Sequence, residues 1–277
     1  MLKKINFNDY THYFIPRNQD YQKEMFGHVA VSVADLSYTG AVRLAAIAAL
    51  RTGAGKVSLV SLQQSEVHLL NLLQAEIMTK KAQNTFELEQ IMSQCNVLTI
   101  GCGLGRIEVS KKWWQYFEKS NIQAVVDADA LHLLAKRPQK RDNWILTPHE
   151  SEAAKLLNID KIHDRIEAVQ EIQHRYGGIV ILKGSVISGT LICTKNEICI
   201  HHGGNAGMAT GGMGDLLAGI ISGLLAQKIA TADIIAKCAV CLHAQAGELA
   251  SKDQQRGTLA SDLLPYIRQL VNTYVQI

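Results

Sequence analysis

Short apolar runs alternate with longer helical patterns along most of this 277-residue chain. The apolar runs are continuous rather than alternating in polarity, which is typical of parallel strands buried on both faces. Because parallel strands are joined by crossover helices, the pattern predicts an α/β three-layer αβα sandwich with a mainly parallel central sheet. The expected strands are His28–Val33, Lys56–Ser61, Val97–Ile100, Ile122–Val126, Trp144–Leu146 and Ile179–Leu182.

Helical periodicity fills the segments between these strands. The expected helices are Thr39–Arg51, Ser110–Lys119, Ala130–Ala135, Glu150–Leu157 and Asp164–Tyr176. The rhythm then changes to two short strands, Ile187–Cys193 and Glu197–Ile200, which flank a hairpin turn at Lys195–Asn196. The rest of the chain is expected to be helical, at Gly212–Gln227, Thr231–Ser251 and Ser261–Val275.

Composition restricts the class of protein. With 47% hydrophobic and 19% charged residues, the chain is too apolar and too weakly charged to be disordered. It has no linker-like segment and no repeat, so we expect residues 1–277 to form a single domain, with residues 1–25 as an arm that packs elsewhere. A net charge of +3 without a basic block argues against nucleic acid as a partner. The lack of a long uncharged apolar run or a signal-peptide pattern favours a cytoplasmic protein that does not span a membrane.

The segment 201–227, HHGGNAGMATGGMGDLLAGIISGLLAQ, carries the strongest indication of chemistry. Glycines at 211, 212 and 214 leave main-chain amides without neighbouring side chains where an apolar helix begins. Such amides bind anions, with help from the helix dipole. Asp215 would repel a phosphate, but it is well placed to take a proton from a hydroxyl that attacks one. The alternative is that Asp215 caps the helix and the glycines form a tight turn.

Polar residues also follow several of the expected strands. Asp127 comes directly after a strand, where it could orient a metal-bound water or cap the next helix. His149 and Glu152 lie at the start of the helix after the Thr-Pro turn, and His149 could contact substrate or satisfy a backbone carbonyl. Lys183 is followed by Gly184 and Ser185, which could approach a nucleotide, although Lys183 could equally be a solvated charge.

In combination, these strings resemble the ADP/ATP-dependent NAD(P)H-hydrate dehydratases, a branch of the ribokinase-like superfamily. The similarity runs from about residue 27 to residue 267. It rests on YTGAVRLAAIAALRTGAGKV (38–57), CGLG (102–105), DADALHLLA (127–135), LTPHESEAAKLL (146–157), LKGS (182–185), GNAGMATGGMGDLLAGIISGLLAQ (204–227) and LHAQAGELA (242–250).

The resemblance implies an enzyme that repairs NADH or NADPH carrying an added water on the reduced ring. ADP or ATP, with Mg²⁺ held largely by phosphate oxygens and water rather than by a dedicated protein site, would phosphorylate the ring hydroxyl, and loss of phosphate would restore the double bond. Asp215 would take the hydroxyl proton, and the amides of Gly212, Met213 and Gly214 would stabilise the transferring group. A homo-oligomer, such as a tetramer, is also implied.

Family correspondence further assigns residues to the two ligands. Those assigned to the hydrated dinucleotide are Ala41, Gly103, His149 and Asp215. Those assigned to the adenine nucleotide are Lys183, Gly184, Ser185, Val186, Ile187 and Gly214. Other candidates for the site are Asn205, Asp127 and Glu152.

The chain departs from the family pattern in four places. Val33-Ala34-Asp35 stands where the first strand usually ends in a glycine pair, and Gln22-Lys23-Glu24 stands where the family has His-Lys-Gly. Cys102 replaces a proline before the glycine of the C-G-L-G turn, and Glu150-Ser151 replaces a Pro-Gly. Two other functions therefore compete with the dehydratase: a small-molecule kinase of the same fold, of the hydroxymethylpyrimidine or thiazole type, and a catalytically weak nucleotide-sensing homologue.

Overall fold

A single twisted sheet runs through the protein in the order β1-β10-β9-β8-β7-β6-β5-β2-β3-β4. The computed structural model describes residues 2–18, 20–62, 74–252 and 255–273. Within these ranges neighbouring strands are parallel, except that β9 is antiparallel to both β8 and β10. The strands are β1 (Lys3–Lys4), β2 (His28–Val33), β3 (Lys56–Leu62), β4 (Met78–Ala82), β5 (Val97–Ile100), β6 (Gln123–Val126), β7 (Trp144–Leu146), β8 (Ile179–Leu182), β9 (Thr190–Cys193) and β10 (Ile198–His201).

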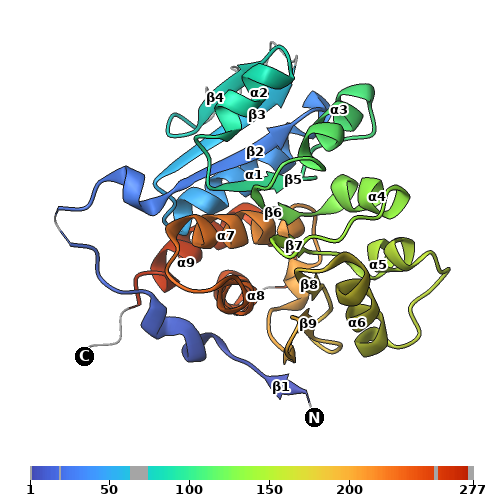
Figure 1. The fold of residues 1–277 in the computed structure, drawn as a ribbon. Coiled ribbons are helices and arrows are strands. Elements are labelled where there is room, and N and C mark those ends of the chain that lie inside the picture. Colours follow the sequence, from blue (N-terminus) through green and yellow to red (C-terminus); the bar gives the residue numbers. More distant parts are fainter. Residues whose placement is uncertain (1, 19, 63–73, 253–254, 274–277) are drawn as a thin grey trace.

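Helices cover both faces of this sheet (Figure 1). On one face lie α1 (Thr39–Arg51), α7 (Met213–Gln227), α8 (Ala232–Ser251) and α9 (Leu263–Leu270). On the other lie α2 (Thr85–Met92), α3 (Glu108–Phe117), α4 (Ala128–Lys136), α5 (Glu150–Leu157) and α6 (Arg165–Tyr176). Each face has its own hydrophobic core, so the predicted three-layer α/β sandwich is confirmed.

Helix α7 lies in the middle of its layer and is apolar along most of its length. Two glycines allow it to approach α1 closely. A Cβ on Gly219 would lie 2.1 Å from the Ala45 carbonyl oxygen, and one on Gly223 would lie 2.1 Å from Thr52 Oγ1. Because larger residues would push the two helices apart, these glycines fix α7, and with it the position of its first turn above the sheet.

The N-terminal segment packs along α8 at the β10 edge of the sheet (Figure 1). Strand β1 pairs with β10, and the 3₁₀ helix η1 (Phe7–Tyr13) follows it. Phe7, Tyr10 and Phe14 are buried in the same core as α7 and α8. Among the described residues, none of the helices is both long and apolar enough to span a bilayer.

The predicted elements differ from the observed ones mainly at the edges of the sheet. Strand β4, with two lysines in five residues, and the two-residue β1 are edge strands, and they lack the apolar runs that mark buried strands. The first hairpin strand begins at Thr190 rather than Ile187, because Ser185 and Ser188 form a turn that ends with the Gly189 amide bonded to the Ser185 carbonyl. The expected helix Ser261–Val275 is observed as α9, and its last two residues lie outside the described ranges.

Candidate active site

The carboxyl ends of β5, β6, β7 and β8 lie side by side and present polar residues to one edge of the sheet. The strand order reverses between β2 and β5, since the chain builds outward in one direction through β3 and β4 and then in the other from β5 to β8. Open α/β sheets bind ligands at such reversals, outside the carboxyl ends of the strands. The residues that follow these four strands therefore define the candidate site.

A tight turn after β5 brings Cys102 against Asp127 at the end of β6. Gly101 has φ +121°, and a Cβ there would lie only 1.7 Å from the Asp127 carbonyl oxygen. The next residue along β6, Ala128, has φ +45°, a left-handed conformation that is strained for a residue with a side chain. Backbone strain of this kind tends to occur at functional sites.

The first turn of α7 contributes free amides and the candidate base. Gly212 precedes the helix with φ +92°, and the first helical hydrogen bond runs from the Leu216 amide to the Gly212 carbonyl. In the described part of the chain, no backbone carbonyl accepts from the amides of Gly212, Met213 or Gly214. The group predicted to bind a phosphoryl group is therefore unoccupied by the protein's own carbonyls.

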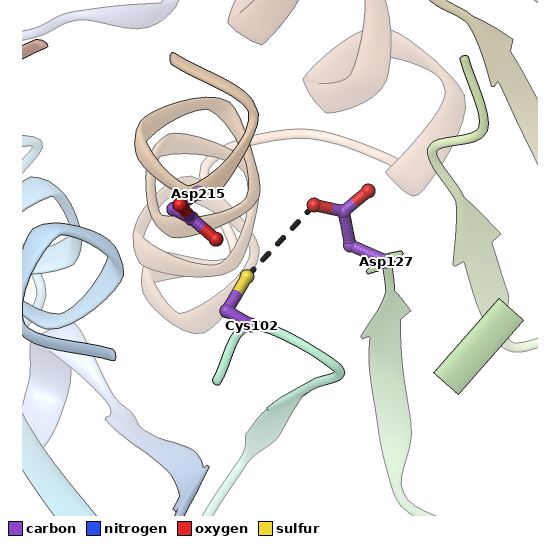
Figure 2. Close-up of side chains that lie close together, drawn as sticks. All are labelled: Cys102, Asp127 and Asp215. Carbon is purple, nitrogen blue, oxygen red and sulfur yellow. Dashed lines mark hydrogen bonds between the residues drawn. The ribbon is translucent and has the colours of Figure 1, made fainter. Parts of the chain in front are cut away.

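Asp215 is half-buried and lies close to Cys102 and Asp127 (Figure 2). Its pKa is raised above the usual range for an aspartate, first because of burial, with the nearby charge of Asp127 adding to the effect. A hydrogen bond from Cys102 and the charge of Lys183 oppose this rise. A carboxylate with a raised pKa is a better proton acceptor near neutral pH, which suits a general base.

Asp127 is held in a polar network rather than at a helix cap. Its Oδ1 accepts hydrogen bonds from Lys183 Nζ and Thr147 Oγ1, both at 2.8 Å, and its side chain makes no capping bond to α4. Glu152 lies 3.9 Å from Lys183 Nζ. Burial opposes the charge on Lys183, but the two carboxylates outweigh it and raise the lysine pKa. Burial also raises the pKa of Glu152.

His149 caps α5 and contacts Glu152 on two sides. Its Nδ1 accepts from the Glu152 amide at 3.4 Å, and its Nε2 lies 3.3 Å from Glu152 Oε1. The ring is half exposed and lines a pocket of about 170 Å³. The other residues of this pocket are Arg106, Ala128, Asp129, His132, Ser151, Glu152 and Lys155.

A larger cavity of about 530 Å³ opens beside the start of α7. Its walls include all six residues assigned to the nucleotide, Lys183, Gly184, Ser185, Val186, Ile187 and Gly214, together with Asn205. Met208, Leu217, Val240 and Ala244 supply an apolar surface. Ile187 is 91% exposed at this site, which leaves its side chain free to pack on a flat apolar ligand. We refer to this space as the nucleotide cavity.

His243 also lines the nucleotide cavity, and its Nε2 is buried without a hydrogen-bond partner. Burial lowers its pKa to about 4, with the charge of Lys183 contributing, so the ring is neutral at physiological pH. A buried polar atom without a partner costs free energy. Because this atom belongs to a residue of the cavity wall, a polar ligand such as a nucleotide fits the residues present.

The cluster of Cys102, Asp127 and Asp215 has ligand atoms within 4.8 Å of one another, but it does not fit Mg²⁺. Mg²⁺ prefers oxygen ligands in octahedral geometry. Cys102 offers a thiol whose pKa burial raises well above its usual range, and the Lys183 ammonium already neutralises Asp127. We call this group of three residues the acidic cluster, and no reaction step is derived from a metal in it.

With this geometry in place, comparisons with known proteins identify the family. A sequence model described as NAD(P)H-hydrate dehydratase matches residues 31–269. A bifunctional NAD(P)H-hydrate repair enzyme of Coxiella burnetii is 40% identical over 261 residues, which cover 92% of this chain and 52% of that protein. The chain belongs to the NAD(P)H-hydrate dehydratase family.

Two further comparisons extend over nearly the whole chain. An ADP-dependent (S)-NAD(P)H-hydrate dehydratase of Neisseria meningitidis is 35% identical over 278 residues, covering 95% of this chain and 91% of that one. A ribokinase-like superfamily protein of Enterococcus faecalis has a TM-score of 0.89 and 26% identity, and the match covers 100% of this chain and 97% of that structure. The chain spans about half the length of the first bifunctional relatives that it matches.

The NAD(P)H-hydrate dehydratase fold places the residues assigned to the dinucleotide less tightly than those assigned to the nucleotide. Gly103 lies against the start of α1, where Ala41 is half-buried, since a Cβ on Gly103 would come within 2.4 Å of Val42 Cγ2. His149 lies at the start of α5 and reaches the acidic cluster only through Glu152 and Lys183. Asn205 caps the 3₁₀ helix Ala206–Met208, with its side chain accepting from the Gly207 amide.

Sequence reasoning missed three residues that shape this dehydratase site. Thr147 and His243 lay within strings used for the family resemblance, but neither was singled out. Arg165 anchors the loop of the nucleotide cavity by donating to the carbonyls of Leu182, Lys183, Ser188 and Gly189. Its position in the first turn of α6, far along the chain from that loop's turn, gave no signal of this role.

Proposed function

We propose that this protein is an ADP-dependent NAD(P)H-hydrate dehydratase that acts in repair of the reduced nicotinamide cofactor. The observation that carries the proposal is the first turn of α7. There, a half-buried aspartate with a raised pKa lies directly after amides that have no carbonyl partner. One of these amides belongs to Gly214, which also lines the nucleotide cavity. The preference for ADP rests on the relative from N. meningitidis, which matches over most of both chains.

In the proposed mechanism, Asp215 accepts the proton of the substrate's ring hydroxyl as its oxygen attacks the terminal phosphoryl group. The new oxygen–phosphorus bond forms while the bond to the leaving nucleotide breaks, so that ADP yields AMP. The amides of Gly212, Met213 and Gly214 stabilise charge on the transferring group. Release of phosphate together with a ring proton then restores the double bond.

The nucleotide cavity supplies the donor site in this proposal. Lys183 is a fixed cation near the phosphates, and the turn at Gly184–Ser185 offers main-chain contacts without large side chains. Val186 and Ile187 are exposed apolar residues that would cover the adenine ring. Mg²⁺, held by phosphate oxygens and water, would neutralise phosphate charge.

The remaining expectations from the resemblance belong to the same proposal. They are a homo-oligomer, such as a tetramer, and a cytoplasmic location. Light scattering of the purified protein coupled to gel filtration measures the first. A monomer at micromolar concentration would contradict it.

The test is an absorbance assay with hydrated NADH, Mg²⁺ and either ADP or ATP. We expect the near-ultraviolet absorbance of NADH to recover with release of one phosphate per molecule restored, and faster with ADP. If a phosphorylated dinucleotide accumulates without recovery, the protein is a kinase. If neither nucleotide gives recovery or a phosphorylated product, the dehydratase proposal is wrong.

A further inference from the structure

The thiol of Cys102 lies between two carboxylates that come from other parts of the chain (Figure 2). Cys102 belongs to the turn after β5, Asp127 follows β6, and Asp215 is in the first turn of α7. The sulfur atom and one carboxylate oxygen of each aspartate all lie within 4.8 Å of one another. Cys102 Sγ is 3.9 Å from Asp127 Oδ2, within donor range for a thiol.

This thiol carries its hydrogen at neutral pH. Burial raises the pKa of Cys102 well above its usual range, and the charges of Asp215 and Asp127 raise it further. The residue is 1% exposed, so solvent and external reagents do not reach the sulfur. A protonated thiol is a weak hydrogen-bond donor, and a carboxylate is the acceptor that strengthens such a bond most.

The single thiol hydrogen has two acceptors, which differ in what else they bind. Asp127 already accepts from Lys183 and Thr147 at 2.8 Å. Asp215 has no comparable side-chain donor besides Cys102, and Lys183 acts on it only through its charge. The thiol hydrogen therefore matters more to Asp215 than to Asp127.

Other titratable groups near this site come from three further elements. Lys183 lies at the end of β8 and Glu152 on α5, and the two approach to 3.9 Å. From α8, His243 interacts with the Met213 backbone and with the charge of Lys183. These groups act on Asp215 in wild type and in Cys102 variants alike, so a difference between the two reports the thiol.

We propose that Cys102 is a positioning residue for the base: its thiol donates to the Asp215 carboxylate before reaction and turns to Asp127 once Asp215 has taken up a proton. The proposal rests on the function proposed above. The substrate proton moves to the Asp215 carboxylate, and the thiol hydrogen remains on sulfur throughout, so no group changes its oxidation state. The sulfur lone pair can then accept from the protonated Asp215.

The first test is the pH profile of kcat/KM, whose acid limb reports protonation of the base in the free enzyme. Cys102→Ala removes the donor, so the pKa of Asp215 rises and the acid limb moves to higher pH. We expect a shift of about 0.5 to 1 pH unit, which corresponds to the loss of one ordinary hydrogen bond. Cys102→Ser keeps a donor and should restore the wild-type position. Cys238→Ala removes a buried thiol elsewhere in the core and should leave the limb unchanged.

A second measurement needs no activity. The infrared difference spectrum between wild type and Cys102→Ser isolates the S–H stretch of this thiol. We expect Asp215→Asn to shift that band, because an amide oxygen is a weaker acceptor than a carboxylate. A band that does not move would overturn the proposal, as would a Cys102→Ala enzyme that only loses thermal stability. A shifted band in a protein that fails to restore NADH would contradict the proposed function and leave the Cys102–Asp215 contact standing.

Discussion

The nucleotide cavity and the acidic cluster meet at the start of α7, but they are built in different ways. The cavity walls come from two continuous strings, residues 183–187 and 203–209, which α7 and α8 complete. The acidic cluster takes one residue from each of three separate elements, so that distant segments supply adjacent atoms. Most cavity contacts come from main chain and apolar side chains, whereas the cluster is a balance of charges.

This contrast separates two kinds of tolerance. A wall made of backbone and apolar surface keeps its shape when one side chain changes. A charge cluster does not, because removal of one buried charge leaves its partner uncompensated. We therefore expect variants in the cluster to affect chemistry and stability, and variants around the cavity to affect mainly the KM for the nucleotide.

The largest effect is expected for Asp215→Asn. Loss of the base should lower kcat by about 10²–10⁴-fold, or roughly 3–5 kcal/mol of barrier, while the KM for ADP stays within about twofold. The folded-state pKa of Asp215 is raised, so its carboxylate costs stability once the pH exceeds that pKa. The melting temperature at pH 7 should therefore stay equal or rise.

The exposed Asp160→Asn serves as the matched control for this variant and should change neither quantity. A kcat for Asp215→Asn within tenfold of wild type would show that another group takes the proton. A lower melting temperature would show that the carboxylate is a structural cap.

Lys183→Met tests the link between the two regions, since this residue lines the cavity and neutralises the cluster. With the ammonium removed, Asp127 and Glu152 would be left close together without a cation. We expect a loss of about 3 kcal/mol in the free energy of unfolding, the lower end for breaking a buried pair, together with a higher KM for ADP.

Urea denaturation at pH 7 measures the stability, and the double variant Lys183→Met/Asp127→Asn should regain about half of the loss. Lys195→Met, in the exposed hairpin turn, is the control. If the double variant is less stable than Lys183→Met alone, the cluster is not held by charge balance.

The sequence was sufficient for the parts of this molecule in which neighbouring residues act together. The buried central strands, the helix after the glycines at 211–214 and the nucleotide-cavity residues all lie in such strings. The placement of Asp127 illustrates the limit. Its position after β6 allowed a cap, and only the packing of β7 and β8 beside β6 decided for Thr147 and Lys183 as partners.

The missed elements have equally physical causes. Strand β4 is stabilised by pairing with β3 and not by burial of its own side chains, so its polar sequence carries no strand signal. Cys102 read as a departure from a family pattern, and its contact with two carboxylates depends on the turn at Gly101. Whether the assigned residues act on the two ligands stays a prediction.

On the cavity side, His243 should produce a pH dependence of stability. Its folded-state pKa of about 4 lies below the usual value of 6.5, so the unfolded chain binds the proton more tightly. Stability is therefore lost as the pH falls from about 6.5 towards 4, by roughly 2 kcal/mol at pH 5. His243→Gln should remove that part of the loss between pH 7 and pH 5, as measured by urea denaturation. His174→Gln, at an exposed histidine on α6, should leave it in place, and equal curves for His243→Gln and wild type would exclude a buried neutral ring.

The smallest effect is expected for Arg165→Ala, which acts on the cavity without touching the cluster. The guanidinium donates to four carbonyls that hold the loop after β8, at 2.7 to 3.3 Å, and its Nε lies 3.0 Å from Glu150 Oε1. Loss of this anchor should raise the KM for ADP about tenfold, roughly the 1.4 kcal/mol of one charge-assisted hydrogen bond, with kcat nearly unchanged. Arg175→Ala removes one guanidinium–carbonyl bond from the same helix, away from the loop, and should leave the KM unaltered. A fall in kcat without a change in KM would mean that the loop positions the reacting groups, and the separation between cavity and cluster would then be wrong.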